Sequence, residues 1–240
     1  MANHPTKSAW ERLALPLTGM SAATFAALAA LRRNRVFHPV GEAYFGTLDL
    51  RTAGADILEL RFLDGTHRVI VRFSRGAGVP EPVPDVLGLA IKIPAAGSGE
   101  IEQDLLLASS ASAPGARNLL IPVRSFFRCT YSSILPYRAG VAQVLFGARA
   151  ISSLRDRKGD FADLERAGVD GDLHFEILVA RLTGAWVKIG SLSVQQHCDQ
   201  ETARALRFNP WNTNPELQPA GPLNTLRRST YKASQRARPD

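Results

Sequence analysis

The chain has 240 residues, of which 45% are hydrophobic and 21% charged, as in an ordinary globular protein rather than a disordered or fibrous one. Its net charge of +7 suggests an anionic partner. Nucleic acid is only weakly supported, because the sequence contains no run of five Lys or Arg residues and its aromatic residues are not interleaved with the basic ones. We therefore expect one domain over residues 1–240 with no nucleic-acid partner.

The cysteines, the N-terminus and the apolar segments bear on where the protein works. Cys129 and Cys198 lack the C-x-x-C spacing of a metal or redox site and suit a reducing cytoplasm, although the two could also pair. The first residues do not form a secretory signal. The apolar run 20–31 is too short to span a bilayer. We expect a packing helix there, with peripheral membrane contact as the alternative, in a cytoplasmic protein.

After residue 34 the hydrophobic pattern changes to a period of two, which is typical of half-buried strands. The strands predicted in this way are residues 42–51, 56–63, 67–74, 87–94, 104–110, 173–181 and 185–196. Asp64-Gly65 predicts a hairpin between the second and third of them, and residues 182–184 predict another. The pattern indicates an α+β fold: an antiparallel β-barrel of about seven to eight strands with inserted and C-terminal helices.

The remaining segments are predicted as helices or connections. Residues 124–150 are expected to be mostly helical, broken at Pro136 and Gly140, and residues 155–171 to form a charged surface connection. A short helix is expected at 201–206, an extended loop at 208–221 and a helix at 222–238. The single domain would thus consist of an N-terminal helical segment (1–34), the barrel (35–197) and a loop with a helix (198–240).

The last predicted helix carries an unusual face. Arg227, Tyr231, Ser234 and Arg238 follow one another at spacings of four, three and four, which places them on one stripe of a helix. One interpretation is a solvated basic helix anchored by its aromatic residue. The other is a tyrosine whose phenol is held ionised by the neighbouring guanidinium, ready to bind a metal.

A second group of candidates surrounds His38, which stands where the first strand begins. Arg35 precedes it in the sequence, and Arg72 and Ser74 share one face of a later strand by alternation. If that face lines the barrel interior, the serine hydroxyl could fix the tautomer of the imidazole. The arginines would then need a bound anion, because unpaired buried charge is costly.

His197-Cys198-Asp199 is a weaker candidate for a cysteine nucleophile, since adjacent residues point in different directions. The sequence contains no phosphate-binding glycine loop, no G-x-S-x-G and no H-E-x-x-H.

Several segments together resemble the catalase superfamily. Residues 35–46 resemble the segment that carries the distal haem histidine, and residues 67–74 and 84–92 resemble the two strands after it. Residues 103–110 resemble the strand that ends in the distal asparagine, and residues 208–212 resemble the approach to the proximal side. These matches follow the order of the family. Arg227-x-x-x-Tyr231-x-x-Ser234-x-x-x-Arg238 is similar to the R-x-x-x-Y-x-x-T-x-x-x-R signature around the tyrosine that ligates haem iron.

The resemblance implies haem b as cofactor, with Tyr231 as the axial phenolate ligand of ferric iron and Arg227 stabilising that phenolate. His38 would be the distal acid and base, with Ser74 orienting its ring. The haem propionates would pair with three arginines: Arg35, Arg72 and Arg238.

The sequence also departs from the family pattern. Ser110 stands where catalases have the distal asparagine, and Phe37 stands beside His38 in place of a smaller aliphatic residue. Phe126 and Phe127 are candidates for the distal aromatic residue. The family's N-terminal arm, wrapping domain and C-terminal domains have no counterpart in the matching segments, which would leave the haem pocket more open.

The function implied by the resemblance is a haem-dependent peroxidase or peroxygenase with weak catalase activity. It would act on hydrogen peroxide or an organic or lipid hydroperoxide, as a homodimer or another small homo-oligomer. One alternative is a haem enzyme that rearranges or dehydrates its substrate. Another is a non-enzymatic barrel that binds haem or a lipid, for which His38 would be dispensable.

Overall fold

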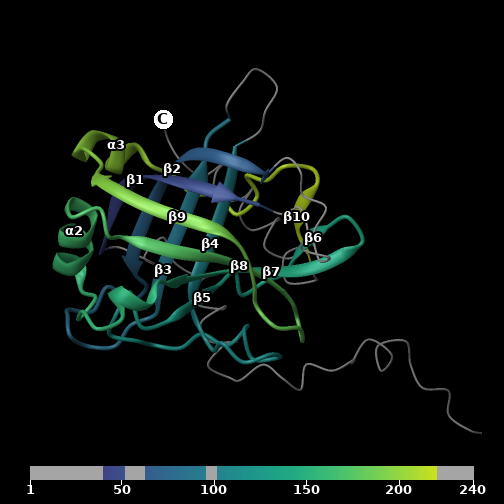
Figure 1. Cartoon of the computed structure of the whole chain (residues 1–240), viewed down its shortest axis with the longest axis horizontal. Helices are drawn as coiled ribbons and strands as arrows, with labels where there is room; N and C mark the ends of the chain where they lie inside the picture. The colour runs from purple at the N-terminus through teal and green to yellow at the C-terminus, as the bar shows by residue number, and fades with distance from the viewer. Residues whose placement is uncertain (1–39, 52–62, 96–101, 221–240) are drawn as a thin grey trace, which may run out of the picture.

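An antiparallel sheet that closes on itself forms the centre of the structure (Figure 1). The computed structural model describes residues 40–51, 63–95 and 102–220. Within these residues the barrel consists of eight strands: β1 (Val40–Leu50), β2 (Gly65–Arg75), β3 (Leu87–Ile93), β4 (Gln103–Ser110), β5 (Thr130–Ser132), β7 (Ala142–Ala150), β8 (His174–Arg181) and β9 (Val187–His197). Pairing runs in the order β1–β2–β3–β4–β5–β7–β8–β9 and returns to β1, so the sheet is closed. The predicted barrel is confirmed.

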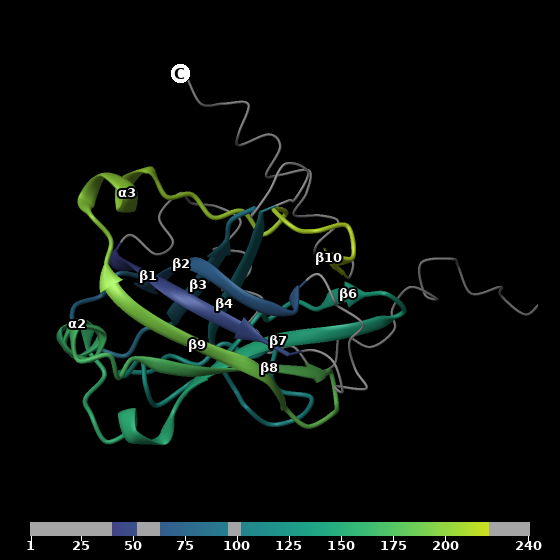
Figure 2. The same ribbon diagram turned by 45° about the horizontal axis from the view of Figure 1, so that its top comes forward.

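The smaller elements lie at the ends of this barrel. They are β6 (Tyr137–Ala139), the 3-10 turn η2 (Ser152–Leu154), α2 (Phe161–Val169), α3 (Gln200–Ala205) and β10 (Leu217–Pro219). Helices α2 and α3 lie at one end, whereas β6 and β10 extend the sheet beside β7 at the other (Figures 1 and 2). Among the described residues, no helix combines the length and the hydropathy needed to cross a membrane.

Most of the predicted strands are confirmed. The strand expected at 56–63 lies outside the described residues except for Leu63, which is in 3-10 conformation. The hairpin at 182–184 joins β8 to β9, and the short helix expected at 201–206 is α3. The helices expected at 20–31 and 222–238 lie outside the described residues.

The helical prediction for residues 124–150 is wrong. This segment contains β5, β6 and β7, and β7 places Val144, Phe146, Ala148 and Ala150 inside the barrel. The sequence of β7 is rich in residues that favour helices, such as Ala, Leu, Gln and Arg. Burial of alternate side chains between β5 and β8 overrides that propensity, as tertiary context often does.

The connection expected at 155–171 contains a helix, α2, so that prediction also needs correction. The Asp160 side chain caps the helix by accepting a hydrogen bond from the Asp163 backbone N–H at 2.8 Å. Leu164 and Ala167 are buried. The helix approaches β9 so closely that a Cβ at Gly168 would lie 2.8 Å from the Gln195 carbonyl oxygen.

Aromatic side chains fill the barrel interior. Phe73 is fully buried, and its ring centroid lies 5.9 Å from that of Tyr44, 5.7 Å from that of Phe126 and 5.5 Å from that of Phe175. Pairs at these separations add stability beyond the area they bury. Strands β1, β2 and β8 and the segment before β5 are therefore held together around one ring.

We expect Phe73→Ala to lower the free energy of unfolding by about 3–5 kcal/mol, because it leaves a cavity at the centre of the barrel. Chemical denaturation followed by circular dichroism measures this change. The control is Val141→Ala, at a fully exposed hairpin position, which should change stability by less than about 0.5 kcal/mol. A loss below about 1 kcal/mol for Phe73→Ala would contradict the central role of this ring.

Candidate functional site

Arg72 and Ser74 lie on the outer face of the barrel. Val71 and Phe73, which alternate with them on β2, are fully buried in the interior core. Because successive side chains of a strand point to opposite faces, Arg72 and Ser74 point outward. The hypothesis that their shared face lines the barrel interior is therefore corrected: they do share a face, but it is the outer one.

A row of small residues crosses this outer face through Ser74. Each of six neighbouring strands contributes one residue, and each of these residues is paired with the one on the adjacent strand. In strand order they are Gly41, Ser74, Gly88, Ala108, Ser132 and Gly147. Ser74 and Ser132 are only 4% and 0% exposed. Side chains of this size leave a floor of small residues on this face, which ends under the Trp186 indole at Gly147, where a Cβ would lie 2.8 Å from that ring.

Arg72 lies at one end of that floor, across Gly41 of the neighbouring strand. A Cβ at Gly41 would lie 2.7 Å from a terminal nitrogen of Arg72 and 2.5 Å from the Phe73 carbonyl oxygen, so only glycine leaves room for this guanidinium. Partial burial lowers the pKa of Arg72, but a guanidinium stays charged at any physiological pH. The floor thus has a fixed, partly desolvated positive charge beside Ser74.

Ser110 lies on the same outer face but away from Ser74. Ser74 is opposite Gly88, Gly88 is opposite Ala108, and Ser110 is two residues further along β4. Two strand spacings of about 4.8 Å separate the serines by roughly 10 Å or more, too far for a direct contact. They can act together only on a ligand that spans this distance.

Ser110 lines a separate pocket of about 540 Å³, over β4, β5 and β7. Among the described residues, its hydroxyl makes long hydrogen bonds to the carbonyl oxygens of Ala111 at 3.4 Å and Thr130 at 3.5 Å. The pocket carries several cationic side chains, an indole and a thiol: Arg128, Arg149, Arg155, Trp186 and Cys129. The sequence did not indicate this group of residues, because three of the five lie in the segment predicted to be helical.

A buried ion pair on β3 and β4 was also missed. Lys92 Nζ lies 2.9 Å from Asp104 Oδ1, and the Asp104 side chain is fully buried. Burial raises the pKa of the Asp104 carboxyl, although Asn209 and Lys92 oppose the shift. A charged residue beside a run of buried apolar residues in each of two strands, LGLAIKI and QDLLLASS, is the signal that could have revealed the pair.

This ion pair anchors the segment that leads to the C-terminus. The Asn209 backbone N–H donates to Asp104 Oδ2 at 2.7 Å, and the Asp104 N–H donates to the Asn212 carbonyl at 2.8 Å. Lys92 Nζ also lies 5.7 Å from the centre of the Phe208 ring. The segment that resembles the proximal approach of catalases is thus fixed on the outer face of the barrel, where Arg72 and Ser74 also lie.

The other predicted site residues lie outside the described residues, so their positions remain predictions: Arg35, His38, Arg227, Tyr231 and Arg238. Two of them are close in sequence to described strands. His38 comes two residues before β1, whose Gly41 pairs with Ser74. Tyr231 follows β10 by twelve residues.

The weaker candidates have structural roles. Burial raises the pKa of Cys198 to about 11, so this residue is a thiol rather than a nucleophilic thiolate near neutral pH. Asp199 caps α3, accepting a hydrogen bond from the Thr202 N–H at 2.8 Å. Cys129 and Cys198 are both free, so they do not pair. Phe126 packs on Phe73 within the core rather than beside Ser74.

Known proteins resemble this chain in structure rather than in sequence. No protein-family description and no curated sequence matches it. A fungal catalase matches with a TM-score of 0.61 and 16% identity, over 88% of this chain and 62% of the fungal one. Catalase A from Saccharomyces cerevisiae matches with a TM-score of 0.63 and 15% identity, over 89% of this chain and 64% of the yeast one. The chain spans less than two thirds of either catalase, and its fold is catalase-like.

We expect Asp104→Ala to lower the free energy of unfolding by about 3 kcal/mol, because Lys92 would remain largely buried beside a single, exposed carboxylate. The Asn209 amide should also lose its protection from hydrogen exchange, since its acceptor is removed. Denaturation and hydrogen exchange measure the two effects.

The matched control for this prediction is Glu102→Ala. Glu102 lies 3.2 Å from Lys92, but its side chain is 48% exposed, so its loss should cost less than about 1 kcal/mol. Equal effects of the two substitutions, or unchanged exchange at Asn209 in Asp104→Ala, would contradict the anchoring role of Asp104.

Proposed function

We propose that this protein binds haem b on the outer face of β1 to β4. There it acts as a haem-dependent oxidoreductase on hydrogen peroxide or an organic or lipid hydroperoxide, with weak catalase activity. The observation that carries the proposal is a catalase-like barrel with Arg72 and Ser74 on one floor of small residues. The catalase resemblance implies that Arg72 contacts a haem propionate and that Ser74 contacts the distal histidine, His38.

The described residues fit the proposed cofactor in shape and charge. On β1 to β4 the row from Gly41 to Ala108 has side chains no larger than serine, which suits a flat macrocycle. The fixed charge of Arg72 at one end suits a carboxylate, since guanidinium and carboxylate groups form strong bidentate pairs. The anchored segment 208–212 brings the chain toward this face before Tyr231.

Tyr231 would hold the iron, and Arg227, four residues earlier in the sequence, would keep its phenol ionised. Ferric haem with such an anionic ligand, when bound, would supply the chemistry that cleaves a peroxide O–O bond. His38 would accept a proton from one peroxide oxygen and return it to the other, with the Ser74 hydroxyl orienting its ring. Arg35, Arg72 and Arg238 would hold the propionates.

Replacing Tyr231 tests the cofactor assignment. We expect purified protein titrated with haemin to show a high-spin ferric spectrum with a tyrosinate charge-transfer band. Tyr231→Phe should lose that band and bind haemin more than about tenfold more weakly, because the axial ligand is gone. Tyr137→Phe, on β6 outside the closed barrel, is the control and should keep the band. Wild-type protein that fails to bind haemin would exclude the proposal.

Replacing His38 tests whether the protein is an enzyme. We expect His38→Ala to slow turnover of hydrogen peroxide or cumene hydroperoxide by about 100- to 10,000-fold, because proton transfer loses its acid and base. Haemin affinity should stay unchanged, and His67→Ala, at the far end of β2, should keep wild-type rates.

Turnover that is undiminished in His38→Ala would contradict the acid-base role. A peroxidase consumes a reducing co-substrate together with the hydroperoxide, whereas an enzyme that rearranges or dehydrates the hydroperoxide does not. Measuring both losses distinguishes the two.

A further inference from the structure

Two loops at one end of the barrel expose a cluster of apolar side chains. The β2–β3 loop and the segment before β5 lie side by side, since Asp85 and Val123 exchange backbone hydrogen bonds of 3.0 and 2.8 Å. Val83 is 49% exposed and Ile121 is 39% exposed. We call the cluster the proline-rich tip, and its exposed members are Pro80, Pro82, Val83, Pro84, Ile121 and Pro122. Such a contiguous exposed group, unlike scattered apolar residues, indicates a binding surface.

The tip is held in this shape from inside. Arg75 is 2% exposed and donates from Nε to the Val79 carbonyl oxygen at 2.8 Å and from a terminal nitrogen to the Val83 carbonyl oxygen. The Asp85 carboxylate accepts hydrogen bonds from the Ala77 N–H at 2.9 Å and the Val86 N–H at 2.7 Å. The loop backbone is thus fixed around a buried guanidinium, and its proline and valine side chains stay outside.

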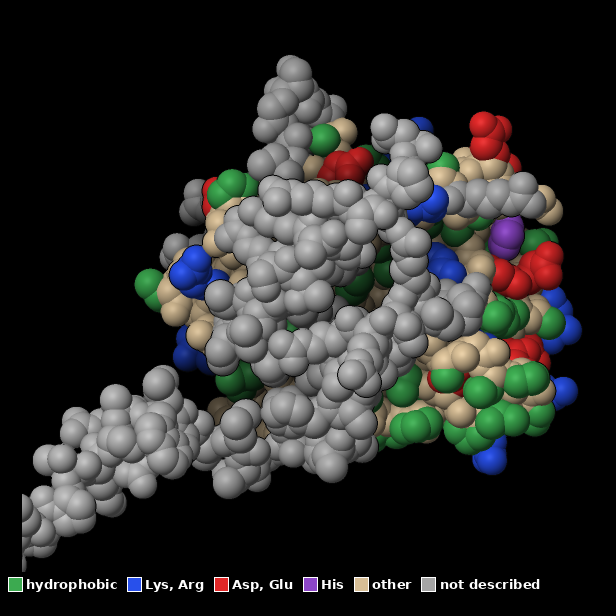
Figure 3. Space-filling model, turned by 180° about the vertical axis from the view of Figure 1, so that it is seen from behind, with side chains coloured by type: hydrophobic (Ala, Val, Ile, Leu, Met, Phe, Trp, Pro, Cys, Tyr) green, Lys and Arg blue, Asp and Glu red, His purple; other side chains and the backbone are tan. Residues whose placement is uncertain are grey.

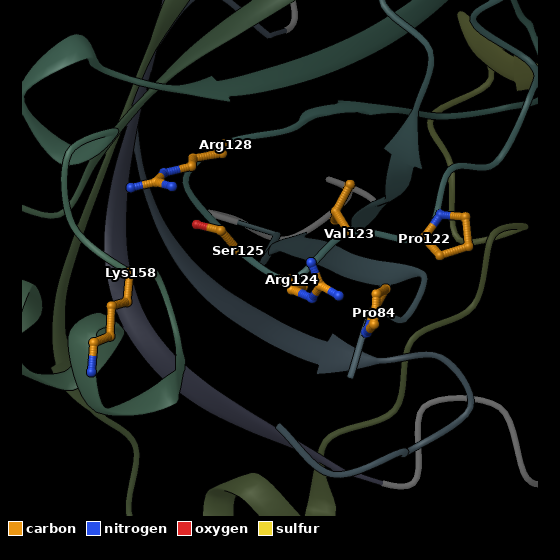
Figure 4. Close-up of a pocket in the computed structure, with 7 residues that line it drawn as sticks. All are labelled: Pro84, Pro122, Val123, Arg124, Ser125, Arg128 and Lys158. Carbon is orange, nitrogen blue, oxygen red and sulfur yellow. The ribbon is translucent and has the colours of Figure 1, made fainter. Parts of the chain in front are cut away.

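A basic pocket of about 380 Å³ opens beside the tip (Figure 4). Its cations are Arg124, Arg128 and Lys158, and Pro84 and Pro122 form part of its wall. Arg124 donates to the Pro82 carbonyl oxygen at 3.2 Å and Arg128 to the Arg155 carbonyl oxygen at 2.8 Å. Carbonyl groups orient these guanidinium groups without cancelling their charge. Within the part of the chain that the structure describes, none of the three cations forms an ion pair with a carboxylate.

We propose that the proline-rich tip and the basic pocket form a docking surface for an anionic lipid membrane. The apolar side chains of the tip would enter the acyl-chain region, and the neighbouring cations would contact the anionic headgroups above it. Apolar and basic side chains also lie together at the lower right edge of the molecule seen from behind (Figure 3). The net charge of +7 adds a long-range attraction between the whole protein and an anionic membrane.

Nucleic acid fits this surface less well. Proteins that bind single strands combine cations with aromatic side chains on which bases stack. The exposed part of the tip consists of proline, valine and isoleucine with one carboxylate, Glu81, which lies 3.9 Å from Arg75. Phe126 and Phe127 beneath it are fully buried. Aliphatic side chains gain free energy by leaving water for acyl chains, whereas they offer nothing to a phosphate backbone. The docking proposal does not depend on the haem chemistry.

Vesicle co-sedimentation of the full-length protein tests the proposal. Vesicles containing phosphatidylserine should bind the protein, vesicles of phosphatidylcholine alone should bind it far more weakly, and added salt should weaken binding. Lys158→Gln and Arg124→Gln should each reduce affinity roughly fivefold. Val83→Asp and Ile121→Asp should each reduce it at least about tenfold, because the apolar contact is lost.

The matched controls lie at the other end of the barrel. Val141→Asp changes the fully exposed turn before β7, and Arg51→Gln removes an exposed cation that follows β1. Both controls should keep wild-type affinity, and all variants should keep the wild-type unfolding midpoint. The proposal is overturned if wild-type protein does not bind the anionic vesicles, if it binds neutral vesicles equally well, or if the tip variants bind like wild type. Losses of equal size in the controls, or tighter binding to RNA than to vesicles, would also overturn it.

Discussion

The packing of the barrel interior decides where this protein can bind anything. An eight-stranded barrel is just wide enough for side chains to fill it, and here Phe73, Tyr44 and Phe175 meet near its centre. The interior is therefore closed to a ligand as large as haem. Several polar side chains of β2, β4 and β5 point outward, yet Ser74, Asp104 and Ser132 are almost completely buried there. The outer face is a second buried layer, and the candidate site belongs to it.

The Lys92–Asp104 pair links this layer to the C-terminal part of the chain. A buried ion pair is weak evidence for stability, because desolvation offsets most of the attraction. The role of the pair is to fix a segment of the chain, because the Asp104 carboxylate also accepts a hydrogen bond from the Asn209 N–H. From this segment the chain continues to Tyr231. A hydrophobic pair of similar volume would fill the space but would offer no acceptor to that backbone.

The end of β2 connects the candidate site with the proline-rich tip. Ser74 turns toward the floor of small residues, and Arg75, the next residue, is enclosed by the loop that carries Val79 and Val83. A membrane docked at the tip would therefore lie a few residues from the proposed haem face. A lipid hydroperoxide is a substrate that such a surface would present, which brings the two proposals together without making either depend on the other.

The sequence by itself determined the strands whose one face is apolar. The alternation in β2, from Val69 to Phe73, and in β8 and β9 was sufficient to predict an antiparallel barrel. It also showed that Arg72 and Ser74 share a face. The Arg227–Tyr231–Arg238 stripe and His38 came from the sequence too, and the described residues do not test them.

Only the tertiary structure decided which face is inside, because alternation defines two faces without saying which one the rest of the chain will fill. It also decided that residues 142–150 form β7, since the neighbouring strands bury Phe146 and Ala148 at a cost to local helix propensity. The distance between Ser74 and Ser110, the Lys92–Asp104 pair and the contact of Arg72 with Gly41 depend on register between strands far apart in sequence. Register follows from packing the whole core at once, and no local pattern contains it.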